Sequence, residues 1–398
     1  MYFVFISPNF PRTYWHFCAE LKNNGANVLG VGDCPYDQLE QELRGSLTEY
    51  YKVDSLEDYG SVFRAVAFFS FKYGKIDWLE SNNEYWLETD ARLRSDFNIT
   101  TGVKAEEIGG WKRKSEMKKF YALGNIPTAR CHRVKDEADT RRFIRQVGYP
   151  VIVKPDVGVG AADTYKLESD EDLRKFFAEK PEVPYVCEEF IEGDIYSYDA
   201  IADGEGRPLF ESSSVFPPSI MDIVLTNGEL SYYTLKKVPA QLKALGRRAL
   251  KSFGVKCRFV HMEFFRLTKA RKGLGEVGDF VGLEVNMRPA GGYTPDMMNF
   301  AHYTDVYKIW ADMVCFGERR LPESGEDCFC IYSSRRDCWT YVHSHEEVMK
   351  KYAGAIVMAE RMPDALASDM GNQMYTARFN TMQEVHAFVR FITERAAQ

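Results

Sequence analysis

Two β-strand patterns joined by a glycine-rich turn place the strongest limit on how this chain can fold. The first pattern, CRFVHMEFFRL, spans residues 257–267, and the second, VGLEVNMRPAGG, spans residues 281–292. The segment between them contains GLGEVGD, which is typical of a turn. The sequence therefore predicts two strands that pair with each other.

Polar and apolar side chains alternate along both patterns. Successive side chains of a strand point to opposite faces, so His261 and Glu263 share one face of the first strand. One face of the second strand carries Glu284, Asn286 and Arg288. Carboxylate and amide oxygens are ligands that Mg²⁺ takes while it keeps several waters. Either strand alone is also typical of the solvated face of a hairpin, so a magnesium–nucleotide site needs support from elsewhere in the chain.

That support comes from residues 149–164, which read YPVIVKPDVGVGAADT. A short β-branched run ends in Lys154 and then opens into a loop that carries Gly158 and Gly160. The strand fixes the position of the ammonium group, and the glycines let backbone N–H groups approach an oxyanion. A Gly-x-Gly pair alone is equally typical of an ordinary turn. Together with the carboxylate-bearing strands, the segment predicts a nucleotide-phosphate site.

The chain resembles the ATP-grasp superfamily over residues 1–320. The elements of that family occur in the expected order: RKSEMKKFYALGNIPTA, VIVKP, the glycine loop, CEEFIEGDIYSYD, and the pair HMEFF and EVNMRPAGG. The resemblance implies a mixed α/β and α+β fold with an N-terminal Rossmann-like lobe, a central ATP-grasp fold and a small C-terminal α+β lobe.

The resemblance also implies roles in phosphate binding. Lys114 and Lys154 correspond to the two lysines that bind the nucleotide phosphates. The flexible loop over the phosphates corresponds to residues 157–163, with nucleotide contacts expected at Val157, Gly158, Gly160 and Ala161.

The hinge that reads the adenine edge corresponds to Glu188, Glu189, Phe190 and Ile191, through their backbone and the Glu188 carboxylate. Two residues after its glycine, this hinge usually carries a glutamate that holds the ribose hydroxyls, and Ile195 stands there instead. Glu192 or Asp194 would then have to reach the ribose.

By the same resemblance, Glu263, Glu284 and Asn286 correspond to the Mg²⁺ ligands. Arg288 corresponds to the arginine that steadies the transferred phosphate or the acyl phosphate. His261 either donates a hydrogen bond to the phosphates or supports a metal carboxylate, with a buried structural histidine as the alternative.

The chain divides into four expected parts. It starts with a strand at residues 2–6, a helix at 14–24 and a second strand at 27–30. The GVGD turn that follows lacks the third glycine of a dinucleotide fingerprint, so no bound NAD is expected. The expected parts are a Rossmann-like domain (1–110), a lid lobe (111–200), a core with the magnesium ligands (201–320) and a small C-terminal α+β module (321–398).

Two further segments are candidates for substrate contact. A strand expected at residues 76–80 leads to Glu84, and ligands of parallel sheets gather at such strand ends. The neighbouring Asn82 or Asn83 could equally cap a helix. After the GG turn, Tyr293, Thr294 and Asp296 either face the acceptor substrate or begin a helix with Pro295 in its first turn.

The function implied by the resemblance is an ATP- and Mg²⁺-dependent carboxylate–amine ligase, with Mn²⁺ as the other cation considered. Such enzymes phosphorylate a small-molecule carboxylate, and an amine then attacks the acyl phosphate, with release of ADP and phosphate. The chain looks nearest to amino-acid and dipeptide ligases and to short carbamoyl-phosphate-synthase-like members. The alternatives are a bicarbonate-activating enzyme and a non-catalytic ATP-binding sensor.

The composition argues against some classes of binding partner. The net charge of −7 argues against a nucleic-acid surface, and no apolar run reaches the ~20 residues of a membrane span. Nine scattered cysteines argue against a secreted disulfide framework, so the protein is expected to be cytoplasmic. The sequence leaves open whether the C-terminal module covers the active site or packs in a homodimer.

Overall fold

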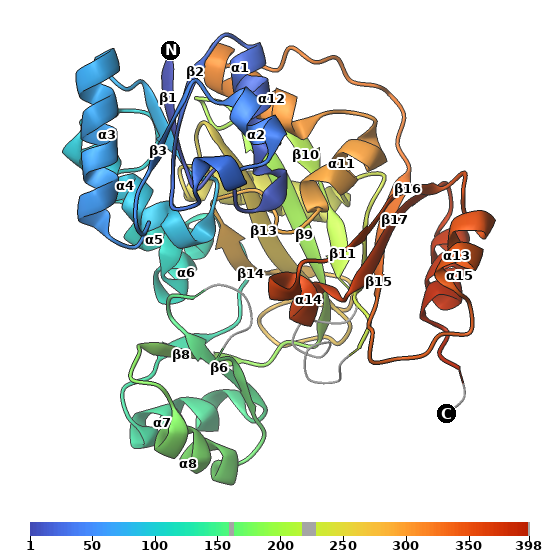
Figure 1. Cartoon of the computed structure of the whole chain (residues 1–398). Coiled ribbons are helices and arrows are strands. Elements are labelled where there is room, and N and C mark those ends of the chain that lie inside the picture. Colours follow the sequence, from blue (N-terminus) through green and yellow to red (C-terminus); the bar gives the residue numbers. More distant parts are fainter. Residues whose placement is uncertain (159–162, 217–227, 397–398) are drawn as a thin grey trace.

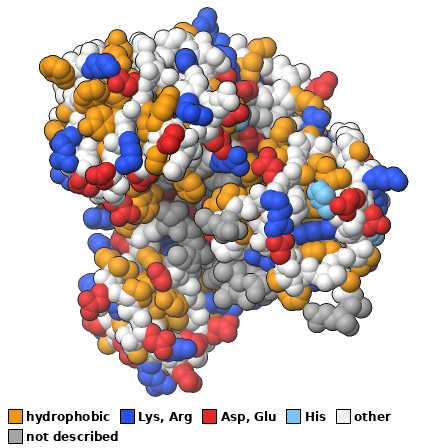
Figure 2. All heavy atoms as spheres, viewed as in Figure 1, with side chains coloured by type: hydrophobic (Ala, Val, Ile, Leu, Met, Phe, Trp, Pro, Cys, Tyr) orange, Lys and Arg blue, Asp and Glu red, His pale blue; other side chains and the backbone are white. Residues whose placement is uncertain are grey.

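The computed structural model describes residues 1–158, 163–216 and 228–396, which form three β-sheets with flanking helices. The N-terminal lobe and a large central sheet make up the main body, and a small lobe projects from it (Figure 1). On the face seen in Figure 2, this small lobe stands clear of the rest of the molecule over most of its surface. No helix among the described residues has both the length and the apolar character needed to cross a membrane.

The N-terminal lobe contains a parallel four-stranded sheet in the order β3-β2-β1-β4. Apolar side chains of β1 alternate between two cores, one under α1 and α2 and the other under α3 and α4 (Figure 1). The strands are β1 (Tyr2–Ile6), β2 (Asn27–Gly32), β3 (Glu49–Lys52) and β4 (Trp78–Glu80). The helices are α1 (Trp15–Asn23), α2 (Gln41–Ser46), α3 (Tyr59–Tyr73) and α4 (Leu87–Asp96), with short 3-10 turns η1 (Arg12–Tyr14), η2 (Tyr36–Gln38) and η3 (Glu84–Trp86). The predicted strand–helix–strand start is confirmed.

The lid lobe is a small antiparallel sheet in the order β5-β8-β6-β7, with two helices packed on one face. Its strands are β5 (Cys131–Arg133), β6 (Val151–Pro155), β7 (Tyr165–Leu167) and β8 (Tyr185–Glu189), and its helices are α7 (Glu137–Val147) and α8 (Asp170–Glu179). Lys154 lies near the end of β6, as the sequence predicted.

In the described residues the central sheet has nine strands, and these strands pair antiparallel. Its order is β14-β13-β9-β11-β12-β15-β17-β16, with β10 paired to β9. The strands are β9 (Gly193–Ala202), β10 (Pro208–Ser212), β11 (Ser214–Phe216), β12 (Ser231–Thr234), β13 (Arg258–Leu267), β14 (Phe280–Asn286), β15 (Phe329–Arg335), β16 (Ile356–Arg361) and β17 (Gln373–Phe379).

Helices cover the apolar side of the β9–β13–β14 region. Tyr121 of α6 and Leu242 of α10 pack with Tyr198, Val260 and Met262 in one buried cluster. The helices of the body are α5 (Gly109–Lys112), α6 (Lys114–Leu123), α10 (Ala240–Ser252), α11 (Thr294–His302) and α12 (Val306–Phe316), and those after residue 320 are α13 (His345–Lys351), α14 (Asp364–Met370) and α15 (Met382–Thr393).

The strands after residue 320 continue the central sheet. Strand β15 pairs with β12 from Ser231↔Ser333 to Thr234↔Cys330, and β17 lies between β15 and β16. The C-terminal residues therefore form one edge of the sheet whose opposite edge carries β13 and β14. The expected four-part division of the chain stays a prediction.

Candidate active site

Strands β13 and β14 pair antiparallel, as the sequence predicted. His261 lies opposite Asn286, and Glu263 lies opposite Glu284. A β-bulge follows Glu263, where the register shifts by one residue. Because directly opposite residues share a face, the four polar side chains project from the same side of the sheet.

Each carboxylate on this face has a cationic neighbour. Glu284 Oε1 lies 3.1 Å from Lys114 Nζ, and Glu263 Oε1 lies 3.3 Å from His261 Nε2. The described residues contain no group of three or more His, Cys, Asp or Glu side chains that could hold a metal. Two carboxylates and the Asn286 amide nevertheless fit Mg²⁺, which prefers oxygen ligands and completes its shell with water and phosphate oxygens.

His261 is buried between two acidic side chains. Its Nδ1 lies 2.7 Å from Asp199 Oδ1, and Asp199 also accepts a 2.5 Å hydrogen bond from Ser197. Burial lowers the pKa of His261, but the two carboxylates outweigh it and raise the pKa to about 9. His261 therefore carries a positive charge at neutral pH in this structure.

Two lysines meet the carboxylate of Glu188 at the start of the hinge. Lys154 Nζ lies 2.8 Å from Glu188 Oε2, and Lys118 Nζ lies 2.6 Å from Glu188 Oε1. Burial opposes ionisation, but the two ammonium groups lower the pKa of Glu188 to about 2. The pKa of Lys154 is raised because Glu188 and Glu284 outweigh its own burial.

The hinge residues do not all face the same way. The Glu189 carboxylate accepts hydrogen bonds from Arg130, with its backbone N–H and guanidinium, and from Arg271. Glu189 is 2% exposed, so its side chain is committed to these arginines, and its backbone N–H donates a 3.1 Å hydrogen bond to the Arg130 carbonyl. Ile191 is buried in a small apolar cluster, and Lys166 lies over the ring of half-buried Phe190.

The start of the glycine loop touches the first phosphate lysine. Lys114 Nζ donates a 3.3 Å hydrogen bond to the Gly158 carbonyl. Val157 and Gly158 are both exposed. The expected contacts at Gly160 and Ala161 lie outside the described residues.

The position of the usual ribose-binding carboxylate is apolar. Ile195 lies opposite Phe265 of β13 and Phe216 of β11. Glu192 and Asp194 are exposed, and Glu192 pairs with Lys269 at 3.1 Å. An apolar side chain with aromatic neighbours thus stands at the position where the family usually has the ribose-binding carboxylate.

A second cluster of charges lies at the carboxyl ends of the parallel strands. Chain order runs from β1 to β2 and β3, and β4 then returns to the other side of β1, so the strand order reverses between β1 and β4. Ligands of open parallel sheets bind at this point of reversal. Glu84 follows β4 there, and Asn83 caps η3 by accepting from the Tyr85 N–H.

Glu84 joins the N-terminal lobe to the segment after β14 that carries Arg288. Its Oε1 lies 3.3 Å from Lys112 Nζ, and its Oε2 lies 3.9 Å from Arg288 Nε. Glu84 is 6% exposed, and among the described residues its Oε2 has no hydrogen-bond partner. A buried acceptor without a donor carries a free-energy cost that an N–H group of a ligand would remove.

The segment after the GG turn begins a helix. Thr294 starts α11 with Pro295 in the first turn, which confirms the helix-start interpretation. Thr294 bonds to Tyr232 at 3.2 Å, and Asp296 Oδ1 accepts a 3.1 Å hydrogen bond from Tyr307. Both residues are buried, whereas Tyr293 reaches Glu360 of β16 at 3.0 Å.

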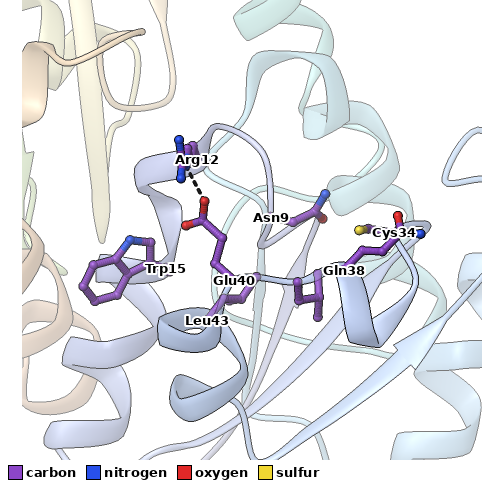
Figure 3. A pocket seen from close by; sticks show the side chains of 8 residues that line it. Asn9, Arg12, Trp15, Cys34, Gln38, Glu40 and Leu43 are labelled. Atoms are coloured by element: carbon purple, nitrogen blue, oxygen red, sulfur yellow. Dashed lines mark hydrogen bonds and ion pairs between the residues drawn. The ribbon is translucent and has the colours of Figure 1, made fainter. Parts of the chain in front are cut away.

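A small pocket of about 180 Å³ lies between the segments that follow β1 and β2 (Figure 3). Leu39, Leu43 and Trp15 line it together with the paired Arg12 and Glu40. The residues that line the pocket include neither Glu84 nor Arg288.

Three residues of the site were missed by sequence reasoning. Lys118 lies one helical turn after Lys114, and this spacing in RKSEMKKF is the only sequence signal for it. Lys112 donates to the Glu84 carbonyl at 2.7 Å, and Tyr14 donates to the Asn82 carbonyl at 2.5 Å. These two contacts join distant parts of the chain and have no local pattern.

Comparison with known proteins agrees with this geometry. The family model described as ATP-grasp domain matches residues 116–256. The chain contains an ATP-grasp domain. The match covers α6, the lid lobe and the core through α10, which includes Lys154 and the hinge.

Two curated relatives of this chain are ligases. The chain is 26% identical over 242 residues to an L-arginine-specific L-amino acid ligase of Bacillus subtilis, and the match covers 58% of each protein. It is 32% identical over 123 residues to the chloroplastic phosphoribosylamine–glycine ligase of Arabidopsis thaliana, over 29% of this chain and 23% of the relative. The chain thus spans little more than half the length of the first relative and less than a quarter of the second.

Solved structures of ligases and synthetases share the fold of this chain over its whole length. An L-amino acid ligase from Bacillus licheniformis superposes with a TM-score of 0.71 at 15% identity, over 100% of this chain and 98% of that one. The N5-carboxyaminoimidazole ribonucleotide synthetase from Thermus thermophilus gives 0.69 at 14% identity, over 100% of both chains. The predicted fold, an ATP-grasp core with flanking lobes, is confirmed.

Proposed function

We propose that this protein is an ATP-dependent carboxylate–amine ligase that acts through an acyl phosphate and releases ADP and phosphate. The observation that carries the proposal is the meeting of two sets of charges. Lys114 and Lys154 lie against the carboxylates of Glu284 and Glu188, and Arg288 on the following turn faces Glu84 of the N-terminal lobe. The relationship to amino-acid ligases supports the same reaction class.

The lysines provide the charge that phosphoryl transfer requires. Transfer of a γ-phosphoryl group is promoted mainly by positioning and by neutralising the charge on its oxygens. Lys114 and Lys154 now pair with carboxylates, and we propose that nucleotide phosphates take the place of these partners. Glu188 would then be free to meet the adenine edge, while the backbone of Phe190 and Ile191 completes the hinge.

Magnesium would be held by Glu263, Glu284 and Asn286, and it would supply further charge neutralisation at the phosphates. Asp199 and Ser197 hold the His261 ring on the same face. We propose that His261 orients the Glu263 carboxylate. This assignment follows from the 3.3 Å contact between the two side chains.

Arg288 and Glu84 are the proposed substrate contacts. The guanidinium of Arg288 suits a carboxylate and the acyl phosphate formed from it. Among the described residues, the Glu84 Oε2 atom has no hydrogen-bond partner, so it suits the N–H groups of an amine. An amino acid offers both groups, and the relationship to L-amino acid ligases supports this substrate class.

The test is release of ADP and phosphate from Mg-ATP in the presence of pooled amino acids, small carboxylic acids or bicarbonate, with mass spectrometry of the products. We expect ADP formation that depends on an amino acid pool and yields a new amide. Folded Lys154→Ala should release no ADP, and ADP release by that variant would contradict the assignment.

A non-catalytic nucleotide sensor is the second candidate, and the apolar surroundings of Ile195 favour it. A sensor would be stabilised against thermal unfolding by Mg-ATP and yet release no ADP with any pool. Turnover that depends on bicarbonate would instead indicate a carboxyphosphate enzyme.

A further inference from the structure

Asp156 links the segments that carry the two phosphate lysines. It directly follows β6, which holds Lys154, and it contacts the first turn of α6, which begins at Lys114. Its Oδ1 accepts a 2.8 Å hydrogen bond from the Ser115 N–H, and its Oδ2 accepts one of 2.9 Å from the Ser115 hydroxyl. The Asp156 carbonyl accepts a 2.9 Å hydrogen bond from the Lys114 N–H. Three hydrogen bonds thus connect two segments that lie 41 residues apart.

The carboxylate satisfies groups that α6 leaves open. Among the described residues, the N-cap residue Arg113 makes no side-chain capping bond. The first N–H groups of a helix have no partner inside the helix, and a carboxylate at this end interacts favourably with the helix dipole. Asp156 is 2% exposed, and its Oδ2 also lies 3.7 Å from the Arg133 guanidinium. Burial and three bonds make this contact far more restrictive than an exposed ion pair.

The two linked segments belong to different lobes. Helix α6 packs on the central sheet, where Met117 and Tyr121 are buried among residues of β9, β13 and β14. Strand β6 belongs to the lid sheet, with Val151 and Val153 in the lid core. The position of Lys154 relative to Lys114 therefore depends on how the lid sits on the body, and Asp156 fixes that placement beside both lysines.

We propose that Asp156 is a positioning residue for nucleotide phosphate binding, because it holds the Lys114 and Lys154 segments at a fixed separation across the two lobes. The inference rests on the proposed function, since it assumes that both lysines bind the same nucleotide. Asp156 acts through these lysines and does not itself touch the phosphates.

The alternative is that Asp156 merely stabilises α6, and the lid provides a matched control. Asp136 caps α7 by accepting a 2.7 Å hydrogen bond from the Asp139 N–H. This carboxylate also caps the N-terminus of a helix of similar length, but in the part of the chain that the structure describes it bonds to neither phosphate lysine. Asp136→Ala therefore removes a cap without removing the link between the lysine segments.

The experiment compares Asp156→Ala, Asp156→Asn, Ser115→Ala and Asp136→Ala with the wild type. For each protein, the dissociation constant of Mg-ATP is measured by calorimetry, and the thermal midpoint is measured without nucleotide. Both alanine variants of the aspartates should lower the midpoint, because each removes a hydrogen bond to the first turn of a helix. Of these two variants, Asp156→Ala alone should weaken Mg-ATP binding, by about tenfold or more.

The conservative variants sharpen the test and protect it against a misfolded Asp156→Ala. Asn keeps an oxygen that can accept from the Ser115 N–H, so Asp156→Asn should restore most of the affinity. Ser115→Ala removes one bond from the other side and should weaken binding by a smaller factor. Equal dissociation constants for Asp156→Ala and Asp136→Ala would overturn the proposal. If Asp156→Ala does not fold, an unchanged constant in Ser115→Ala would overturn it.

The proposed function and the role of Asp156 can be refuted by different results. A wild type that binds Mg-ATP but forms no ADP with any substrate pool refutes the ligase, while the order of dissociation constants still decides the role of Asp156. A wild type that does not bind Mg-ATP refutes both.

Discussion

Two histidines in this protein each contact an aspartate and one further polar side chain, but they occupy different places in the fold. His261 Nδ1 lies 2.7 Å from Asp199, and its Nε2 lies 3.3 Å from Glu263. His302 Nδ1 also lies 2.7 Å from an aspartate, Asp327, and its Nε2 lies 2.9 Å from the Ser212 hydroxyl. We refer to them as the sheet-face cluster (Asp199, His261, Glu263) and the helix-end cluster (Ser212, His302, Asp327).

The helix-end cluster has the hydrogen-bond order of a serine hydrolase triad, and the sheet-face cluster does not. Ser212 is 0% exposed, however, so a substrate has no access to its hydroxyl. His302 ends α11 and connects it to β10 and to the segment before β15. The sheet-face cluster instead lies beside Glu284 and Asn286 on the polar side of β13 and β14. Access and surrounding charge, more than the order of bonds, distinguish a reaction site from a structural link.

The largest difference should appear when each cluster loses one oxygen group. Glu263→Gln removes a proposed cation ligand and should reduce ADP formation about 1,000-fold, in line with losing a main electrostatic contact in a transition state. Ser212→Ala should leave turnover within about twofold, because it changes a group away from the reacting atoms. Steady-state ADP release measures both, and a strongly impaired Ser212→Ala enzyme would reverse the comparison.

Replacing the histidines should give a smaller contrast. His261→Asn removes the partner that orients Glu263 and should reduce turnover about 10- to 100-fold, as for other groups that orient metal ligands. His302→Asn should retain wild-type turnover below its melting temperature. Circular dichroism establishes that both variants are folded, and equal activity losses would show that the two clusters play the same part.

Changes in the helix-end cluster should alter the free energy of unfolding. His302→Ala leaves the buried Ser212 hydroxyl without its partner, which costs about 1–3 kcal/mol of unfolding free energy. Urea unfolding measures this loss. A variant as stable as the wild type would show that the two hydrogen bonds of His302 contribute nothing to the fold.

A pH effect of smaller size is expected at the other end of α11. Burial raises the pKa of Asp296 from its ordinary 3.8 to about 7, against the opposing hydrogen bond from Tyr307. The folded state therefore keeps a proton that the unfolded chain has already released between these values, so this contribution to stability is lost as pH rises from about 4 to 7.

Asp296→Asn removes that titration. The wild type should lose more stability than Asp296→Asn between pH 5 and pH 7.5, as measured by thermal midpoints in matched buffers. Parallel pH profiles of the two proteins would place the ionisation of Asp296 outside this range.

Local patterns predicted the central part of the site. Alternation along CRFVHMEFFRL and VGLEVNMRPAGG depends only on strand geometry, so it placed Glu263, Glu284 and Asn286 on one face before their register was known. The same rule separates Glu188 from Glu189, which face opposite ways. Treating the hinge as one block of nucleotide contacts overlooked this, and the Glu189 side chain meets Arg130 and Arg271 instead.

Contacts between distant segments were not predictable from one sequence. Asp156 and Ser115 meet because the lid lies against α6, and Glu84 meets Arg288 because the N-terminal lobe lies against β14. Such pairs follow from the packing of lobes and leave no periodic signal. The same holds for the pairing of β12 with β15, which joins the C-terminal strands to the central sheet.

That pairing bears on how the protein is synthesised. Strands β9, β13 and β14 can assemble once about three quarters of the chain has left the ribosome, since β14 ends at Asn286. The edge of β12 stays open until residues 329–335 arrive, and β15 in turn waits for residues 373–379. An open strand edge is a template for pairing with other chains. A ribosome that stops between residues 286 and 329 would therefore release a nascent protein whose proposed catalytic face can form, but whose opposite edge is prone to aggregation.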